Sequence, residues 1–210
     1  ELEMAYYEMA VQAGIRMYPC WLMEVEGNKH FMTKRFDREG NKKIHMQTLA
    51  ALYPEADSYE RLLWVCRKMQ LSELDSEEIF RRMIFNILAN NTDDHNKNFS
   101  FLMDESGKWS LSPAYDLTYI FNMRGYLPET QHCMMIRGKL SNITLEDVME
   151  LAKENGIRRA EKIIMEVSAT VKDFRSFAEK RGAQERWISA IEHTIQENLE
   201  SWGLIAHTLT

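Results

Sequence analysis

Hydrophobic positions recur at helical spacing over most of this chain. Residues 2–13 carry apolar side chains three or four positions apart, and Gly14 then suits a helix end, so the chain begins inside a helix. The same spacing predicts helices near 45–53, 58–70 and 75–90. The residues that suit their N-terminal caps are Ser58 for the second of these three, and Asp75 or Ser76 for the third.

The last third of the chain also follows a helical pattern. The Thr-Leu-Glu-Asp sequence at 144–147 predicts a helix start, and the Asn-Gly pair at 155–156 predicts a helix end. Two long helical segments are then expected near 157–180 and 184–201.

Short runs rich in β-forming residues and bounded by turn residues predict two β-hairpins. The first joins 21–25 to 29–36 through Glu26-Gly27-Asn28, and the second joins 99–103 to 108–111 around Ser106-Gly107; a further turn falls at 39–41. Together with the helices, these hairpins predict an α+β fold.

Composition narrows the class of protein. With 210 residues, 45% of them hydrophobic, the chain can bury the core of one domain, in one or two lobes. Its formal net charge of -6 gives no general attraction to nucleic acid or to an anionic membrane. No apolar run reaches the roughly 18–20 residues of a membrane span, and three dispersed cysteines without a CxxC pair favour reduced thiols and a cytoplasmic location.

The segment richest in reactive groups is the polar loop that follows the helix predicted near 75–90. Phosphoryl transfer needs a carboxylate beside the attacking hydroxyl, and an amide oxygen with a second carboxylate for magnesium. Protein kinases place the first two groups as Asp-x-x-x-x-Asn, which is the spacing of Asp93 and Asn98. Asp116, after the second hairpin, is a candidate for the second carboxylate, since Mg²⁺ prefers oxygen ligands. Lys97 is a candidate cation for the transferred phosphate.

Simpler interpretations of these residues stay open. Aspartate and asparagine are common in turns and caps, so Asp93 and Asn98 alone also fit a structural loop. A metal hydrolase built on Asp93, Asp94 and His95 lacks a second histidine or carboxylate pair at ligand spacing. The histidines interpreted as ordinary surface or packing residues are His30, His132, His193 and His207.

Several short motifs, taken together, resemble one family. The loop reads NTDDHNKNFS over 91–100, and the segment after the second hairpin reads WSLSPAYDL over 109–117. Further matches are KRFDR at 34–38, IHMQ at 44–47, EMAYY at 3–7 with AGI at 13–15, and FRRMIFN at 80–86. These motifs cover about residues 1–140, and they resemble the HipA-type serine/threonine kinases, the toxins of bacterial toxin–antitoxin modules.

The resemblance implies a role for each motif residue. The family's catalytic residues correspond to Asp93, His95 and Lys97, its magnesium ligands to Asn98 and Asp116, and its nucleotide-binding residues to Lys34, Phe36, Asp37 and Gln47. Without the resemblance, the stretch Arg35–Arg38 is interpreted as an exposed strand end with a surface ion pair.

The implied fold is kinase-like. Residues 1–38 are expected to form the remainder of a small N-lobe, with a β-hairpin and the hinge, and residues 39–210 a larger, mainly helical C-lobe that carries the catalytic and metal-binding loops. The implied cofactors are ATP and Mg²⁺. The 210 residues contain no Gly-rich phosphate loop and no strand lysine for the α- and β-phosphates. We therefore expect upstream residues or a separate N-lobe polypeptide to supply them, and the chain alone to be inactive.

The implied activity is phosphorylation of a protein serine or threonine, including autophosphorylation. By analogy with the family, the target acts in translation, such as an aminoacyl-tRNA synthetase, and a DNA-binding antitoxin of the HipB type is a partner. Two alternatives are a catalytically silent kinase-like module that docks the antitoxin and a small-molecule or lipid kinase. Because a silent module needs none of Asp93, Asn98 and Asp116, their joint presence favours catalysis.

Overall fold

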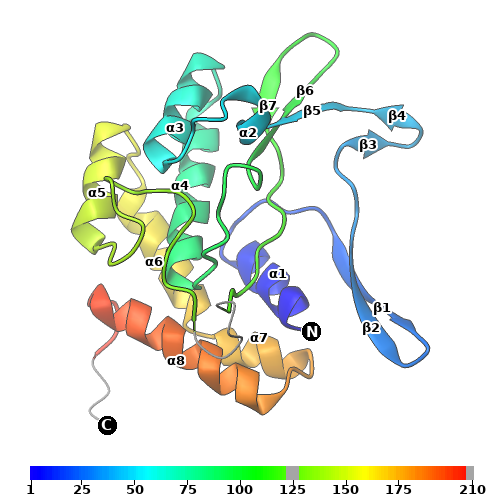
Figure 1. Ribbon diagram of the computed structural model, residues 1–210, viewed down its shortest axis with the longest axis vertical. Helices are drawn as coiled ribbons and strands as arrows, with labels where there is room; N and C mark the ends of the chain where they lie inside the picture. The colour runs from blue at the N-terminus through cyan, green and yellow to red at the C-terminus, as the bar shows by residue number, and fades with distance from the viewer. Residues whose placement is uncertain (122–127, 207–210) are drawn as a thin grey trace.

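Helix α4 (Glu73–Leu88) forms the centre of the protein in the computed structural model, which describes residues 1–121 and 128–206 (Figure 1). Its apolar side chains at Ile79, Phe80, Met83 and Ile84 are fully buried. Because buried residues occur on every side of its second half, this helix needs neighbours all around. Helices α3, α6 and α8 provide those contacts.

The other helices of the described residues largely follow the predicted pattern. They are α1 (Leu2–Gln12), α2 (Leu49–Leu52), α3 (Tyr59–Lys68), α5 (Leu145–Glu154), α6 (Ala160–Val171), α7 (Phe174–Lys180) and α8 (Glu185–Ser201). The prediction of one long segment near 157–180 is wrong. The chain turns at Asp173, where the hydrogen bonds from Asp173 N to the Thr170 carbonyl and from Ser176 N to the Asp173 carbonyl replace the helical ladder, and α7 then packs against α1 and α8.

Side-chain caps explain where several helices begin. The Ser58 hydroxyl accepts a hydrogen bond from Arg61 N, which confirms the predicted cap of α3. Helix α4 starts earlier than predicted, because Ser72 is its cap and the Asp75 carboxylate accepts a hydrogen bond from Ser72 N as part of a capping box. The predicted start of α5 is confirmed by a second capping box, formed by Thr144 and Asp147.

A two-stranded hairpin stands apart from the helical body at the right of Figure 1. It pairs β1 (Cys20–Val25) with β2 (Asn28–Thr33). Its turn residues Glu26 and Gly27 have φ values of 50 and 77°, the left-handed conformation that two-residue hairpin turns need. The first predicted hairpin is confirmed, although β2 ends at Thr33. A second, very short hairpin pairs β3 (Arg38–Glu39) with β4 (Lys42–Lys43).

A three-stranded antiparallel sheet lies at the top of Figure 1, in the order β5-β6-β7. Strands β6 (Ser100–Met103) and β7 (Trp109–Leu111) form the second predicted hairpin. The helix predicted over 45–53 is wrong in its first half, because His45–Thr48 form β5 and pair with β6. Only α2 remains helical there. Since β6 directly follows the polar loop, the sheet holds that loop against the end of α4.

The mixture of helices with small antiparallel sheets confirms the predicted α+β class. One buried apolar cluster extends from Ala5 in α1 to Trp202 after α8. The division into lobes at residue 38 stays a prediction. In the described part of the chain, no helix has the length and apolar character needed to cross a membrane.

Candidate active site

The loop between α4 and β6 carries the predicted catalytic residues on the end of a buried helix. It is anchored by Asn91, whose backbone N–H donates to the Asn86 carbonyl at 2.9 Å and whose Nδ2 donates to Asn86 Oδ1 at 2.9 Å. Farther along, Asn98 Nδ2 donates to the Asp93 carbonyl at 2.8 Å. The segment from Asp93 to Asn98 is therefore a closed turn, and the two residues lie side by side.

Asp93 presents its carboxylate to solvent. Its side chain is 44% exposed, with His95 Nε2 at 3.5 Å and the thiol of Cys133 at 3.9 Å from Oδ1. No backbone N–H of the described residues donates to this carboxylate. A hydroxyl group from another molecule can therefore reach it, as a general base requires.

Asp94, the next residue, has the opposite environment. It is 1% exposed, and its carboxylate accepts hydrogen bonds from the Tyr59 hydroxyl at 2.7 Å and from Cys133 N at 2.8 Å. His132 Nδ1 lies 3.0 Å from the same carboxylate. Asp94 therefore holds the segment around Cys133 against the loop that carries the predicted catalytic residues, which is a structural role.

The buried polar network extends beyond Asp94. Asn86 Nδ2 donates to the Tyr59 hydroxyl at 3.0 Å. Burial, followed by the charge of Asp94, raises the pKa of Tyr59 well above its usual value, so its hydroxyl stays a donor. The sequence interpretation overlooked Tyr59, Asn86 and Cys133. An amide in the middle of the apolar run of α4 was a signal for Asn86, whereas Tyr59 and Cys133 have no such local signal.

The interpretation of the histidines needs one correction. His132 is 7% exposed and belongs to the Asp94 network, so it is more than an ordinary packing residue. His30 and His193 are exposed, as expected, and His207 lies outside the described residues. In the described part of the chain no group of three or more His, Cys, Asp or Glu side chains is placed to hold a metal.

Asp116 has a backbone conformation that non-glycine residues rarely adopt, with a φ of 58°. The preceding residue connects it to the catalytic loop, because the Tyr115 hydroxyl donates to the Lys97 carbonyl at 2.7 Å and also contacts the Ser100 hydroxyl. Asp116 also lines a cavity of about 290 Å³ between α1 and the β1–β2 hairpin, with Met17 among its walls.

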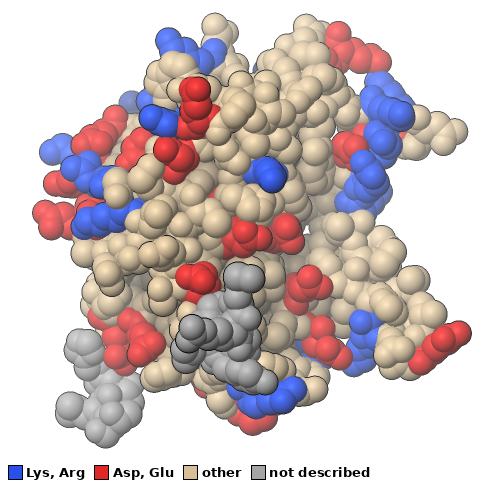
Figure 2. All heavy atoms as spheres, in the orientation of Figure 1, with Lys and Arg blue, Asp and Glu red and all other residues tan. Residues whose placement is uncertain are grey.

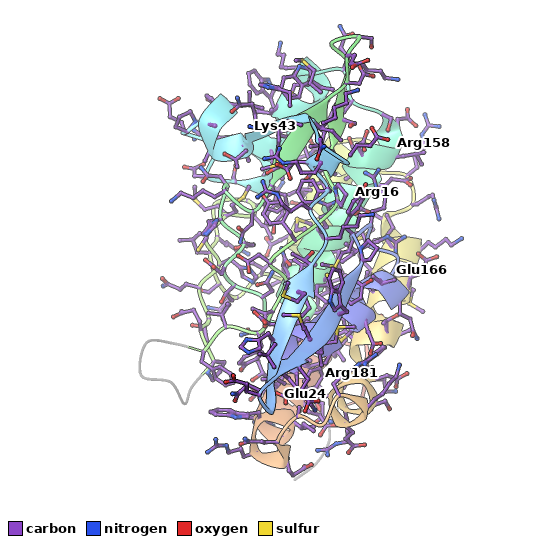
Figure 3. All side chains as sticks on the ribbon, turned by 90° about the vertical axis from the view of Figure 1, so that its right-hand side faces the viewer. Arg16, Glu24, Lys43, Arg158, Glu166 and Arg181 are labelled. Atoms are coloured by element: carbon purple, nitrogen blue, oxygen red, sulfur yellow. The ribbon has the colours of Figure 1, made fainter. Side chains whose placement is uncertain are left out.

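A buried arginine anchors the segment before Asp116. Arg82 is 2% exposed; its Nη2 donates to the Ser112 carbonyl at 2.8 Å and its Nε to Glu78 Oε1 at 2.9 Å. The same Glu78 oxygen accepts from the backbone N–H of Arg16, labelled in Figure 3, and the Arg16 carbonyl accepts from Ala114 N. Helix α4 thus positions both the loop from Asn91 to Asn98 and the chain that leads to Asp116.

Only some of the predicted nucleotide-binding residues lie close to the loop from Asn91 to Asn98 or to Tyr115. Phe36 lies against Tyr115, with ring centroids 5.6 Å apart. Gln47 lies on β5 opposite Phe101, one strand from the loop. Neither Lys34 nor the Asp37 carboxylate makes a hydrogen bond or ion pair with the catalytic loop among the described residues.

The surface ion pair expected for the Arg35–Arg38 stretch is present. Arg35 donates through Nε and Nη2 to the two oxygens of Asp37, at 2.8 and 2.7 Å. These hydrogen bonds lower the pKa of Asp37. Figure 2 shows basic side chains over this part of the surface, near β3–β4, and acidic ones beside the furrow between the helical body and the β1–β2 hairpin.

Comparison with known proteins decides the family. The model of the HipA-like C-terminal domain matches residues 1–175. The chain belongs to the HipA-like C-terminal domain family. This confirms the family predicted from the loop and SPAYD motifs.

Similar proteins agree with this assignment to the HipA-like family. A curated protein of Sinorhizobium fredii named "Putative kinase Y4dM" is 31% identical over 90 residues, which are 40% of this chain and 22% of that protein. The HipA of Shewanella oneidensis MR-1, solved with HipB and operator DNA, matches with a TM-score of 0.73 at 18% identity, over 95% of this chain and 54% of that one. The Helicobacter pylori proinflammatory kinase CtkA matches with a TM-score of 0.69 at 12% identity, over 98% of this chain and 84% of that one.

These matches confirm the kinase-like fold of the HipA-like domain. The chain spans about half of the HipA chain and about a fifth of the Sinorhizobium protein. The activity, substrates and partners of the whole protein are therefore proposals, and so are the roles of the individual site residues.

Proposed function

We propose that this HipA-like domain transfers the γ-phosphate of ATP to a serine or threonine hydroxyl of a protein, with Mg²⁺ as cofactor. The observation that carries this proposal is the exposed Asp93 carboxylate, placed by hydrogen bonds beside Asn98 and connected through Tyr115 to Asp116. A carboxylate open to an incoming hydroxyl, next to oxygen ligands for a cation, is the arrangement that phosphoryl transfer requires.

The chemistry of Asn98 and Asp116 fits Mg²⁺. Because Asn98 Nδ2 donates to the Asp93 carbonyl, its Oδ1 is left as the metal-ligating atom. The strained φ of Asp116 is a cost that functional positions commonly carry. Two atoms near this set, His95 Nδ1 and Thr92 Oγ1, are buried and have no hydrogen-bond partner among the described residues, as expected for a loop that completes its contacts with a ligand. When bound, Mg²⁺ would neutralise charge on the phosphates.

The roles of the remaining residues follow from their positions. Asp93 accepts the proton of the attacking hydroxyl, His95 lies beside it, and Lys97 supplies a positive charge for the transferred phosphate. Phe36, whose ring lies tilted against Tyr115, offers an aromatic surface for the adenine base. Lys34 contributes backbone groups there, Gln47 lines the same pocket, and Asp37 binds the ribose after its pair with Arg35 opens.

We also propose that upstream sequence or a separate N-lobe polypeptide supplies the phosphate-binding loop. The β1–β2 hairpin supports this part of the proposal. Trp21, Met23 and Val25 alternate along β1 and are 44, 41 and 43% exposed, so one face of the hairpin is apolar and uncovered among the described residues. Further strands of an N-lobe would cover such a face.

The partners are proposed by analogy. The Shewanella HipA structure contains HipB and operator DNA, so a DNA-binding antitoxin of the HipB type is the proposed regulator here. The proposed substrate is a protein of the translation apparatus, such as an aminoacyl-tRNA synthetase, and the kinase also phosphorylates itself in the cytoplasm. A silent module that only docks the antitoxin is the competing function.

Calorimetric titration of ATP into the full-length protein, with and without Mg²⁺, tests the nucleotide site. We expect Mg²⁺-dependent binding, a loss of about tenfold or more in Asp116→Ala, and much weaker binding by the 210-residue chain alone. Asp93→Asn is the matched control, because it should bind ATP like the wild type. Binding that ignores both Mg²⁺ and the Asp116 substitution contradicts the proposed site.

A further inference from the structure

A second cavity, of about 530 Å³, is lined in part by His132, which contacts the buried Asp94. It is enclosed by the end of α4, by α8, and by residues 128–144. Its volume is within the range of small-molecule sites, roughly 300–1,000 Å³. Ile87, Ile143 and Trp202 form apolar parts of its wall. None of the predicted site residues lines it.

Two asparagines have amide oxygens without a hydrogen-bond partner among the described residues. Asn198 Nδ2 donates to the carbonyls of Ile87 and Leu88, at 3.1 and 3.4 Å, and Asn90 Nδ2 donates to the Glu129 carbonyl at 3.1 Å. Since the nitrogen of each amide is used, its Oδ1 is the atom that remains for another molecule. Both residues line the cavity.

His132 adds a third acceptor. Its Nδ1 is 3.0 Å from the buried carboxylate of Asp94, which can only accept a hydrogen bond. The proton of a neutral His132 therefore belongs on Nδ1, and Nε2 carries a lone pair. Nε2 has no hydrogen-bond partner among the described residues, and the imidazole lines the cavity.

The electrostatic potential in the cavity is negative, which favours a cation, as these acceptors do. The cavity lies at the C-terminal end of the 16-residue helix α4, where the helix dipole is negative, and the last turn of α4 has no basic residue. Glu197 also lines the cavity, and its Oε1 lies 3.5 Å from His193 Nε2. No lysine or arginine of the described residues lines the cavity.

We infer that this cavity binds a small organic cation, with ammonium groups on a short alkyl chain, as in a diamine or polyamine. Ammonium groups donate hydrogen bonds without accepting any, which matches the Asn90, Asn198 and His132 acceptors, and the alkyl chain fits against Ile143 and Trp202. Contact with His132 would reach the catalytic loop through Asp94. The inference is independent of the proposed kinase activity, because it concerns binding alone.

The test is calorimetric titration of two probes of equal length, 1,8-diaminooctane and octane-1,8-diol, into the full-length protein at physiological ionic strength. We expect one diamine site and no binding of the uncharged diol. Glu197→Lys should weaken diamine binding about tenfold or more. Ser141→Lys, which places a resident ammonium on the wall, should weaken it similarly.

Glu24→Lys is the matched control, because it changes the net charge equally on the β1–β2 hairpin (Figure 3) and Glu24 does not line the cavity. It should alter the diamine affinity less than about twofold after screening by salt. Equal weakening by Glu24→Lys and Glu197→Lys would show general charge attraction and overturn the inference. So would equal binding of the diol, or no diamine binding at about 1 mM.

Discussion

The twin aspartates of the catalytic loop give the sharpest prediction, because two adjacent, identical residues should respond differently to the same substitution. Asp94→Asn keeps the shape of the side chain and replaces one oxygen by an NH₂ group. If the remaining oxygen accepts from Cys133 N, the new NH₂ group faces both the Tyr59 hydroxyl and His132 Nδ1. That hydroxyl already accepts from Asn86, so its proton loses its acceptor.

The expected loss of stability follows from these contacts. A fully buried hydroxyl without a partner costs about 1–3 kcal/mol, and replacing a charged acceptor of the Cys133 N–H by a neutral one costs about 1 kcal/mol more. Asp94→Asn should therefore lower the free energy of unfolding by about 2–4 kcal/mol. Asp93→Asn should change it by less than about 0.5 kcal/mol, because the Asp93 side chain is 44% exposed.

Equilibrium urea denaturation of both variants at pH 7 measures the difference. A double-mutant cycle with Tyr59→Phe isolates the cause, since removing the hydroxyl also removes the unpaired donor. Asp94→Asn should then be less destabilising in the Tyr59→Phe background than in the wild type. Equal stability of the Asp93 and Asp94 variants, or an Asp94 effect that does not depend on Tyr59, would refute this reasoning.

Two further predictions use the pKa shifts. Hydrogen bonds from Arg181, and then Lys180, lower the pKa of Glu8 in the folded state. The stability that these bonds give is therefore present above the pKa of Glu8 in the unfolded chain. It is lost as the pH falls through the pKa of Glu8 in the folded protein. Glu8→Gln should therefore be less stable than the wild type at pH 7, and the difference should narrow in urea denaturation below about pH 4.3; a constant difference would contradict the ion pair. Burial, followed by the charges of Asp94 and Asp93, raises the pKa of the Cys133 thiol to about 11. Alkylation of Cys133, followed by mass spectrometry, should be slow at pH 8 and faster in Asp93→Asn, and an unchanged or slower rate would be inconsistent with this electrostatic account.

Local signals explain which parts of the fold could be predicted from the sequence. The start of α5 depends on Thr144 and Asp147, which are three residues apart, so it can be predicted from the local sequence alone. Strand β5 depends on pairing between His45 and Met103, and no local pattern reports a partner that distant. The apolar spacing over 45–53 therefore predicted a helix where long-range hydrogen bonds form a strand.

The candidate site was predictable as a set of motifs, but the environment of each residue was not. The spacing of Asp93 and Asn98 indicated a kinase loop, and the structure places them in one hydrogen-bonded turn. Whether Asp93 or Asp94 is exposed depends on His132 and Cys133, about 40 positions away. The strained φ of Asp116 depends on the fold around it in the same way.

Transfer of labelled phosphate from ATP tests the central claim most directly. The full-length protein is incubated with γ-labelled ATP and Mg²⁺, and label on its own serine or threonine residues, or on a protein substrate, is measured beside Asp93→Asn. The account predicts transfer by the wild type and a loss of several orders of magnitude in Asp93→Asn, with the fold and ATP binding retained. Transfer at the wild-type rate by Asp93→Asn would contradict the assignment of the base. Absence of transfer by a folded wild type that binds ATP would favour the silent docking module.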